Sequence, residues 1–545
     1  MTILKGQGVS EGIERGEIRF FRRKNTGMVQ ETAEDAALEL RRLRRALDLS
    51  VRQLEETAKQ TRVRIGDSAA ALFEAHAMMA ADEEFVRTMQ ALIRQGKSAE
   101  FAVRQAGERF AQLLGASDDA YLRGRAADIR DVAHRIVENL LGVWKEKNPA
   151  GQEHPVILAA EELSPSETIR LDPAGILAIA VQNGSPTSHT AILARTLGIP
   201  AVCGLGPLLN EASDGLDAWI DGETGELVIE PDEEMCAEFE KRREGRERRS
   251  VELKSLVGKE DVTQDGQKML VYCNISSPGD ISAVLENDGR GVGLFRSEYL
   301  YLGRSDLPGE EEQFEAYREV AQAMQGRRVI VRTLDAGADK KAESLGLPPE
   351  ENPALGMRAV RVCLSRPELF RTQLRALYRA SAYGKISVMF PMIASVWELE
   401  ECLAACRCVQ EELCAEGRAF DEHLETGVMI ETPAAVLIAD ELAARVNFFS
   451  VGTNDLTQYL LACDRQRSDL GRHWDPHHPA VLRALRMTAQ AAHKAGIWVG
   501  ICGELAADLS MLPEFLSMGI DELSVPAAFV LPLRAAIRSH GKKDS

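Results

Sequence analysis

A single histidine, His189, lies in the stretch SPTSHTAILARTLGIPA (residues 185–201), where small hydroxyl residues lead into a helical pattern. The N-terminus of a helix presents free backbone N–H groups and the positive end of the helix dipole, so it stabilises a bound anion. The neighbouring Ser and Thr hydroxyls can add hydrogen bonds. This setting predicts a histidine that carries a negatively charged group. The alternative is a histidine with a structural hydrogen bond at the start of an ordinary helix.

A second set of reactive residue types follows the β-type runs of the C-terminal half. These residues are Arg296, Arg332 with Asp335, Glu431, Asn454 with Asp455, Arg465, and Cys502 with Glu504. Guanidinium groups bind phosphate or carboxylate oxygens through paired hydrogen bonds, so three arginines that converge on one mouth indicate an anion site. The alternative is that each arginine forms a structural ion pair with a nearby carboxylate.

Two carboxylates and one thiol in this set suggest further chemistry. Glu431 and Asp455 are hard oxygen donors, which suit a magnesium ion held by few protein ligands and completed by substrate and water; an ion pair with the arginines is the alternative. A thiol has an unperturbed pKa of about 8.5, so Cys502 can donate a proton to a carbanion or enolate. An inert buried cysteine is the alternative there. Together these residues predict a small phosphorylated, carboxylated ligand bound through a metal.

The elements that must bring these residues together are eight β-type runs, separated mostly by helical patterns. The runs are MLVYCNI, GVGLFRSE, VIVRTLD, ISVMFPM, GVMIE, FFSVGTN, WVGICGE and ELSVP. Eight β/α units within residues 257–545 predict a closed parallel (β/α)8 barrel of the TIM type. In such a barrel the reactive face lies at the carboxyl ends of the strands.

The N-terminal half shows a different organisation. Residues 30–145 are rich in Ala, Leu, Glu and Arg with apolar residues three and four apart, which predicts a helical bundle. This bundle interrupts a β/α domain formed by residues 1–29 and 146–231. Residues 232–256 are highly charged and helix-forming, with Gly245 as the weak point, and predict a helical connector. The whole chain is therefore predicted to be a multidomain α/β protein.

Composition restricts the possible partners and location. The chain has 545 residues and a formal net charge of −19, which argues against nucleic-acid binding because phosphate backbones attract cationic proteins. There is no signal-peptide pattern and no run of about 18 apolar residues, so we expect a cytoplasmic protein without membrane insertion.

Several motifs together resemble those of a known family. They are TSHTAILAR, GVGLFRSEYL, RTLDAGADK, EENPALGMRA, MFPMI, ETPAA, SVGTNDLTQY and ICGELA, with ALFEAHAMMAADEE and YLRGRAADIRD in the helical insertion. With these motifs the sequence resembles enzyme I of the phosphoenolpyruvate (PEP)-dependent sugar phosphotransferase system, a PEP–protein phosphotransferase. The resemblance implies a swivelling phosphohistidine domain with a helical insertion and a PEP-binding barrel. It also implies the transfer of a phosphoryl group from PEP to a histidine, with release of pyruvate.

The resemblance implies a role for each matching residue. His189 takes the phosphoryl group on Nε2, Thr168 supports its ring, and Cys502 is the general acid. The residues that would bind PEP are Arg296, Arg332, Asn454, Asp455 and Arg465, with Arg358 adding to the positive field. The ligands of Mg²⁺ would be Glu431 and Asp455.

Partners are also implied by the resemblance. The acceptor is the small phosphocarrier protein HPr, docked on the helical insertion, and members of the family form homodimers through the barrel. The candidate docking residues are Met78, Met79, Asp82, Glu83 and Glu84. A solvated helix cap is the alternative for the three acidic ones. His189 would have to visit both the barrel mouth and HPr, so we expect a swivel about residues 232–256.

Two other functions are considered. A PEP synthase or pyruvate phosphate dikinase shares the histidine motif and the barrel, but it carries a large ATP-binding domain before the histidine, which this sequence does not predict. A PEP-sensing docking protein would bind its ligand without turnover. The presence of Cys502 and His189 argues against it, because sensing needs no proton donor.

Overall fold

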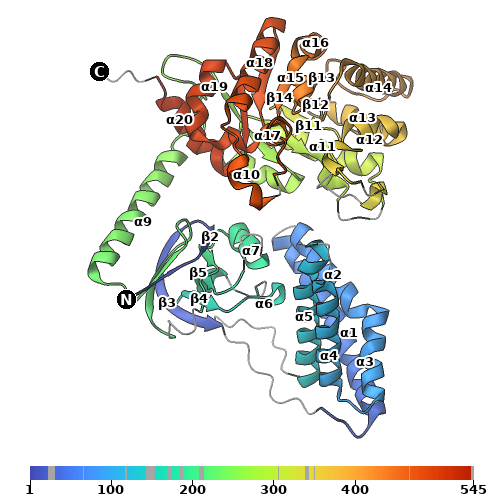
Figure 1. The fold of residues 1–545 in the computed structure, drawn as a ribbon, viewed down its shortest axis with the longest axis vertical. Coiled ribbons are helices and arrows are strands. Elements are labelled where there is room, and N and C mark those ends of the chain that lie inside the picture. The colour runs from blue at the N-terminus through green and yellow to red at the C-terminus, as the bar shows by residue number, and fades with distance from the viewer. Residues whose placement is uncertain are drawn as a thin grey trace. The chain divides into compact units, whose positions relative to one another are not determined.

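The computed structural model divides the chain into two compact units, Met1–Arg248 and Arg249–Ser545 (Figure 1). Each unit is described here by itself. The structure describes residues 1–21, 31–64, 67–116, 120–142, 154–168, 171, 173–184, 188–207, 214–302, 304, 306–337, 343–348, 350–465 and 467–541.

The first unit contains an eight-stranded mixed sheet with the strand order β1-β8-β7-β3-β4-β5-β6-β2. Its strands are β1 (Thr2–Lys5), β2 (Gln7–Ser10), β3 (Ile13–Phe21), β4 (Val156–Ala160), β5 (Ile176–Val181), β6 (Ala201–Cys203), β7 (Asp217–Asp221) and β8 (Glu226–Ile229). Strand β4 is apolar throughout, as expected for a strand buried on both faces. Because side chains alternate along a strand, Ile157 and Ala159 pack into one hydrophobic cluster and Leu158 and Ala160 into another.

The second of these clusters is covered by the helix that begins at His189. Helix α7 (His189–Leu197) contributes the buried side chains of Ala191 and Ala194 to it. The short helix α6 (Pro165–Thr168) lies next to α7, and the buried hydroxyl of Thr190 donates a hydrogen bond to the Leu163 carbonyl at 3.2 Å. Helix α7 is therefore fixed on one face of the sheet.

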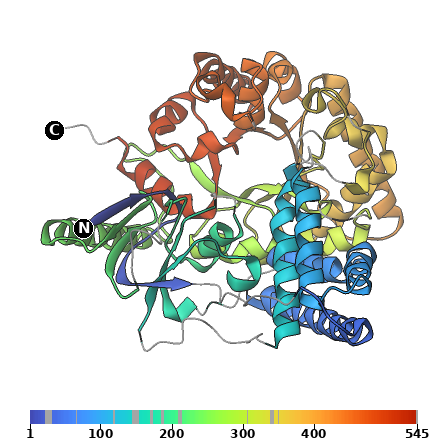
Figure 2. The same ribbon diagram turned by 60° about the horizontal axis from the view of Figure 1, so that its bottom comes forward.

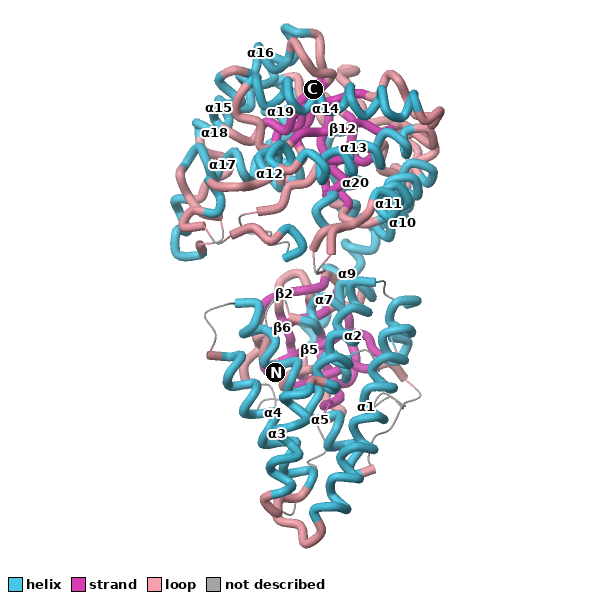
Figure 3. The backbone as a smooth tube through the Cα atoms, turned by 90° about the vertical axis from the view of Figure 1, so that its right-hand side faces the viewer, coloured by secondary structure: helices cyan, strands magenta, loops and turns pink. Residues whose placement is uncertain are grey.

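A helical bundle is inserted between β3 and β4, and Figure 3 shows its helices lying alongside one another. The helices are α1 (Ala36–Arg64), α2 (Asp67–Ala81), α3 (Glu83–Arg94), α4 (Ala99–Gly115) and α5 (Ala120–Leu141). Two side chains of α5 hold the loop that carries α6. Arg135 Nη2 donates to Ser166 Oγ at 2.8 Å, and Asp131 Oδ2 accepts from the Ser166 backbone N–H at 3.3 Å.

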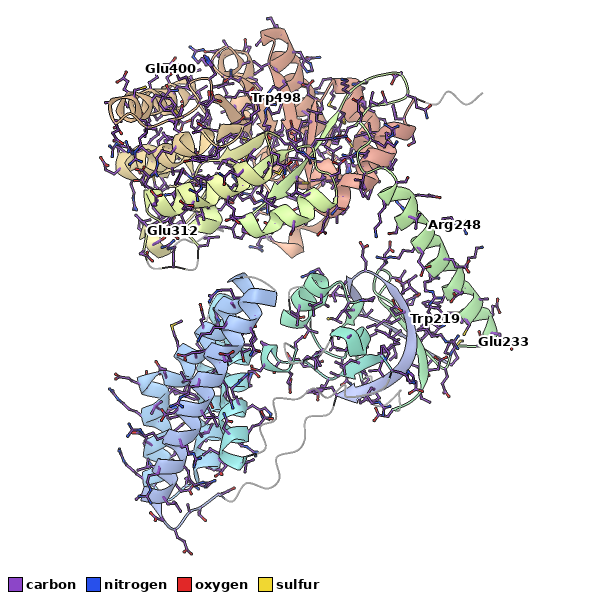
Figure 4. All side chains as sticks on the ribbon, turned by 180° about the vertical axis from the view of Figure 1, so that it is seen from behind. Trp219, Glu233, Arg248, Glu312, Glu400 and Trp498 are labelled. Atoms are coloured by element: carbon purple, nitrogen blue, oxygen red, sulfur yellow. The ribbon has the colours of Figure 1, made fainter. Side chains whose placement is uncertain are left out.

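The predicted connector is a helix, α9 (Glu233–Lys254), which runs through Gly245 without interruption. Its first half packs on the sheet of the first unit. The rings of Phe239 and Trp219 stack with 5.5 Å between centroids, and Arg242 forms ion pairs with Asp221 and Glu226 at 3.6 and 3.3 Å. Figure 4 labels Trp219 beside the helix and Glu233 and Arg248 along it. The helical connector expected over residues 232–256 is therefore attached to the first unit along the first half of α9.

The second unit is a closed barrel in which neighbouring strands are parallel. Its strands are β9 (Leu270–Ile275), β10 (Val292–Arg296), β11 (Val329–Arg332), β12 (Ile386–Phe390), β13 (Glu425–Ile430), β14 (Phe448–Val451), β15 (Trp498–Ile501) and β16 (Glu522–Val525). Seven of them lie within the runs that the sequence predicts, and β13 begins two residues before the run GVMIE, at Glu425. The fold class, a multidomain α/β protein with a TIM-type barrel, is confirmed.

Helices surround the strands of the barrel, as Figure 2 shows. They are α10 (Ile281–Glu286), α11 (Glu310–Ala323), α12 (Val360–Ser365), α13 (Pro367–Ser381), α14 (Val396–Ala415), α15 (Pro433–Leu437), α16 (Ala439–Ala443), α17 (Thr453–Leu461), α18 (Pro479–Ala495), α19 (Leu512–Met518) and α20 (Val530–Ser539). Among the described helices of both units, none is long and apolar enough to cross a lipid bilayer.

Candidate active site

A pocket of about 430 Å³ opens at the carboxyl ends of the barrel strands. It forms there because parallel strands in a barrel all end at the same face, so the residues that follow them converge. Seven of the residues predicted from the sequence line it: Arg296, Arg332, Glu431, Asn454, Asp455, Arg465 and Cys502. Arg296 and Arg332 end β10 and β11, Glu431 directly follows β13, and Cys502 directly follows β15.

Buried ion pairs hold the inner arginine of the pocket in place. Arg332 is 4% exposed, and its guanidinium contacts the carboxylates of Glu298 and Asp335, the latter at 3.0 Å. Burial alone would lower the pKa of Arg332, but the surrounding carboxylates, Glu298 and Asp335 first, raise it above its usual value. This guanidinium is therefore a permanent cation with a fixed orientation.

Arg358 takes a position different from that of the pocket arginines. Its guanidinium is 1% exposed and bridges Asp335, at 3.1 Å, and Asp455, at 2.9 Å. Arg358 contacts the Asp455 carboxylate and is not among the described residues that line the pocket. Its contacts make it a residue that orients a pocket carboxylate, whereas the sequence analysis placed it among the substrate-binding groups.

One carboxylate oxygen of Glu431 accepts a hydrogen bond, and the other has no hydrogen-bond partner among the described residues. Oε1 accepts a hydrogen bond from the Met392 backbone N–H at 2.7 Å, while Oε2 is buried without a hydrogen-bond partner among the described residues. Burial, followed by the charges of Asp455 and Asp335, raises the pKa of Glu431 to about 8. A buried carboxylate oxygen of this kind favours a bound cation or a proton.

Glu431 and Asp455 are the residues that could hold a divalent metal in this pocket. Among the described residues, in this pocket and outside it, no three or more His, Cys, Asp or Glu side chains form a group that could hold a metal ion. Two carboxylates with substrate and water as the remaining ligands suit Mg²⁺, which usually keeps several waters. The unpartnered Oε2 of Glu431 is consistent with that use.

Cys502 lies at the wall of the pocket. Its side chain is 3% exposed, and its Sγ donates to the Val451 carbonyl at 3.7 Å. Burial raises the pKa of the Cys502 thiol to about 12, although the nearby Ser450 hydroxyl lowers it. The thiol is therefore protonated at neutral pH, as an acid must be before it donates.

The pocket also contains residues that the sequence analysis did not assign to the site. Asn454 Nδ2 donates to Glu504 Oε1 at 3.0 Å, and Asn454 Oδ1 accepts from the Glu504 backbone N–H at 2.9 Å. Glu504, Glu298, Tyr299 and Trp474 all line the cavity. Glu504 was grouped with Cys502 in the sequence analysis, whereas Glu298, Tyr299 and Trp474 were not named there. Glu298 lies two residues after Arg296, so its position just past a strand end was the available signal.

His189 and Thr168 lie in the first unit. The N-cap of α7 is Ser188, whose side chain accepts from the Ala191 backbone N–H at 3.3 Å, and His189 is the first residue of the helix. The backbone setting is the one that the sequence predicts, while the side chain of His189 lies outside the described part of the chain. Thr168 is buried at the end of α6, and its hydroxyl donates to the Ser164 carbonyl at 2.7 Å.

The candidate docking residues lie at the junction of α2 and α3. Met78 is 69% exposed, and Met79 is half-buried against the helical core. Asp82 is the N-cap of α3 and accepts from the Phe85 backbone N–H at 2.8 Å. Glu83 pairs with Arg87, and Glu84 is exposed to solvent. Asp82 therefore has a structural role in addition to its charge.

Three family models match the chain, one for each part of this architecture. The model for the PEP-binding domain of PEP-utilising enzymes matches residues 250–541. The models for the N-terminal and the mobile domains of the same enzymes match residues 5–125 and 152–225. Fold and site thus define a PEP-utilising enzyme.

Similarity to curated proteins narrows the class. The chain is 39% identical over 546 residues to the phosphoenolpyruvate-protein phosphotransferase of Bacillus subtilis, covering 100% of this chain and 96% of that protein. It is 40% identical to that of Priestia megaterium, covering 99% and 94%. A solution structure of an Enzyme I protein is 33% identical and covers 45% of this chain and 99% of its own, with a TM-score of 0.39. The chain belongs to the phosphoenolpyruvate-protein phosphotransferase family, and the resemblance drawn from its motifs is confirmed.

Proposed function

We propose that the chain transfers the phosphoryl group of PEP to His189 and then to a histidine of the phosphocarrier protein HPr, and that it releases pyruvate. The observation that carries the proposal is one barrel pocket that assembles three arginines, an amide, a protonated thiol and the carboxylates of Glu431 and Asp455. A ligand that needs all of these is small, anionic at two ends and proton-accepting at carbon. PEP meets each condition.

The arginines and the amide bind and orient PEP. Arg296, Arg332 and Arg465 supply forked donors to phosphate and carboxylate oxygens, and Asn454 with the Asp455 backbone completes the site. Charge on the peripheral oxygens dominates the transition state of phosphoryl transfer, so fixed cations lower its energy without reorganisation. The buried pairing of Arg332 with Glu298 and Asp335 supplies that fixed orientation.

Glu431 and Asp455 would hold Mg²⁺, which when bound neutralises charge on the phosphate oxygens. The ion pair with Arg358 keeps the Asp455 carboxylate in place. Neutral His189 Nε2 attacks phosphorus as the bond to the enolate oxygen breaks. Cys502 then protonates the C3 carbon of the enolate, which becomes the methyl group of pyruvate.

The phosphohistidine at the start of α7 would be stabilised by the helix N-terminus, with Thr168 supporting the ring. The parts of this proposal are a phosphohistidine domain of residues 1–29 and 146–231, a carrier-binding insertion of residues 30–145, a connector of residues 232–256 and a barrel of residues 257–545. His189 must move between the barrel and HPr, and a homodimer through the barrel completes the proposal.

Labelled PEP tests the proposal directly. Incubation with [³²P]PEP and Mg²⁺ should label the protein with an acid-labile phosphohistidine and release pyruvate, and added HPr should remove the label. His189→Ala should abolish labelling while PEP still binds the barrel. A PEP sensor would bind PEP yet form neither phosphohistidine nor pyruvate, and that outcome would sink the proposal.

A further inference from the structure

The interior of the barrel contains polar side chains that the phosphoryl-transfer steps do not use. Glu522, at the start of β16, is 1% exposed, and neither of its carboxyl oxygens has a hydrogen-bond partner among the described residues. The Ser450 hydroxyl on β14 and the Trp498 indole N–H on β15 are also buried without such a partner. Buried polar groups are nearly always hydrogen-bonded, so unpartnered ones on three adjacent strands indicate a functional use.

Strand register places this group directly beneath Cys502. Ser450 pairs with Gly500, and Gly500 pairs with Glu522, so the three form one row across β14, β15 and β16. Cys502 follows Gly500 by two residues and therefore lies on the same side of β15, one layer nearer the pocket. The Ser450 hydroxyl is near enough to Cys502 to lower the pKa of its thiol.

Two glycines make room for the Glu522 carboxyl in this row. A Cβ on Gly500 would lie 1.9 Å from Glu522 Oε2, and a Cβ on Gly293 would lie 2.4 Å from Glu522 Oε1. The carboxyl therefore lies over Gly500, the residue between it and Ser450. A side chain at either glycine would displace it.

The protonation states suit a donor. Burial raises the pKa of Glu522 well above its usual value, which favours the protonated, neutral form of the carboxyl. Once Cys502 has given up its proton, its thiolate is a buried strong base, because burial raises the pKa of the thiol to about 12.

We propose that Glu522 is a proton reserve that restores the Cys502 thiol through the Ser450 hydroxyl after each net turnover. The inference rests on the proposed function. In the chemical step, the S–H bond of Cys502 breaks and a C–H bond forms at C3 of the enolate. The Ser450 proton then passes to sulfur while the Glu522 proton passes to the Ser450 oxygen, once rotation of the Ser450 and Glu522 side chains closes the contacts that are open among the described residues. Glu522 finally regains a proton from solvent water, so each turnover moves one proton from water to pyruvate.

A comparison of net transfer with PEP–pyruvate exchange can distinguish a proton-supplying role of Glu522 from a role in packing. Net transfer from PEP to HPr consumes one proton per cycle and needs the reserve. Exchange of labelled pyruvate into PEP, without HPr, returns the proton to Cys502 in the reverse step and does not need it. The first turnover also uses only the proton that Cys502 already carries.

The test compares Glu522→Gln, which keeps the shape but has no titratable proton, with the wild-type protein by quenched flow. We expect first-turnover pyruvate formation and PEP–pyruvate exchange at the wild-type rate, and net transfer to HPr slower by at least about tenfold. Ser450→Ala should show the same pattern, and the double variant should be no slower than either single one because both interrupt one route. Glu310→Gln, which removes a half-buried carboxylate of α11 paired with Arg375 and Arg379 of α13 outside the barrel strands, is the matched control and should change none of the three rates.

Two results would overturn the inference. One is net transfer by Glu522→Gln at the wild-type rate, and the other is equal slowing of exchange, first turnover and net transfer, which a packing role would produce. If the wild-type protein forms no pyruvate from PEP, the proposed function itself fails, and this result is distinct from both.

Discussion

The barrel pocket and the candidate docking residues of the helical insertion are both charged, but they hold their charges in different ways. In the barrel, Arg332 and Arg358 are nearly inaccessible to solvent and are fixed by buried carboxylates. On the insertion, Glu83 and Glu84 are exposed, and Glu83 pairs with an exposed Arg87. Exposed charges are screened by salt, whereas buried pairs are screened much less.

This difference fits two different tasks. Phosphoryl transfer requires dipoles and charges that are already oriented before the reaction, because reorganising them would add to the barrier. Recognition of a transient protein partner requires speed and reversibility, which exposed complementary charges provide through long-range attraction. The predictions below test whether the two regions differ in this way.

The largest effect is expected at Cys502. Cys502→Ala should slow pyruvate formation from PEP by about 10²- to 10⁴-fold, the usual contribution of a general acid, while PEP binding persists. The measurement is rapid-quench pyruvate release together with PEP titration. Cys406→Ala is the matched control, because Cys406 is also 3% exposed but lies on α14, away from the pocket. An unchanged rate in Cys502→Ala would show that protonation at carbon does not depend on this thiol.

Stability should also distinguish the two kinds of charge. Arg358→Met removes the buried cation from Asp455 and leaves Asp335 with Arg332 alone, so the free energy of unfolding should fall by about 3–5 kcal/mol. Arg486→Met removes an ion pair with Glu514 in which both side chains are about half exposed, and it should change that free energy by less than about 1 kcal/mol. Urea denaturation of both variants measures the difference. Equal losses would contradict the contrast between fixed and screened charges.

Thiol reactivity tests the setting of Cys502. With a pKa raised to about 12 by burial, about one thiol in ten thousand is ionised at pH 8, so alkylation should be very slow. Cys408 and Cys414 are exposed and should react first with iodoacetamide, as mass spectrometry of timed samples can show. For the same reason the rate of pyruvate formation should not fall between pH 7 and 9 through loss of the Cys502 proton. Rapid labelling of Cys502 would show that its thiol is not the acid form.

The sequence predicts the barrel site well because two simple rules connect it to structure. Apolar runs of strand length identify the strands, and closure of a parallel barrel brings the ends of all strands to one face. Residues directly after a run, such as Arg332, Glu431 and Cys502, therefore converge whatever their side-chain conformations are.

Other features depend on contacts that periodicity does not encode. Arg358 follows no strand directly, and only the packing of its guanidinium between Asp335 and Asp455 shows that it faces a carboxylate and not the cavity. The helix around Gly245 continues because the preceding turns are anchored to Trp219 and Asp221 by tertiary contacts, which outweigh a helix propensity cost of about 1 kcal/mol. The buried position of the Glu522 carboxyl could not be predicted from the sequence either, because glycines on two other strands make room for it.

The smallest effect is expected on the helical insertion, where Glu84→Gln removes one exposed charge. Binding of HPr should weaken by no more than about 1 kcal/mol at low ionic strength, and the loss should vanish at high salt. Glu55→Gln is the matched control, because it removes one exposed charge from α1 of the same insertion, outside the candidate docking residues, and should leave the affinity for HPr unchanged. Titration calorimetry at two salt concentrations measures both variants. A loss of affinity that persists at high salt would mean that Glu84 makes a desolvated contact, and the docking residues would then hold their charges as the barrel pocket does.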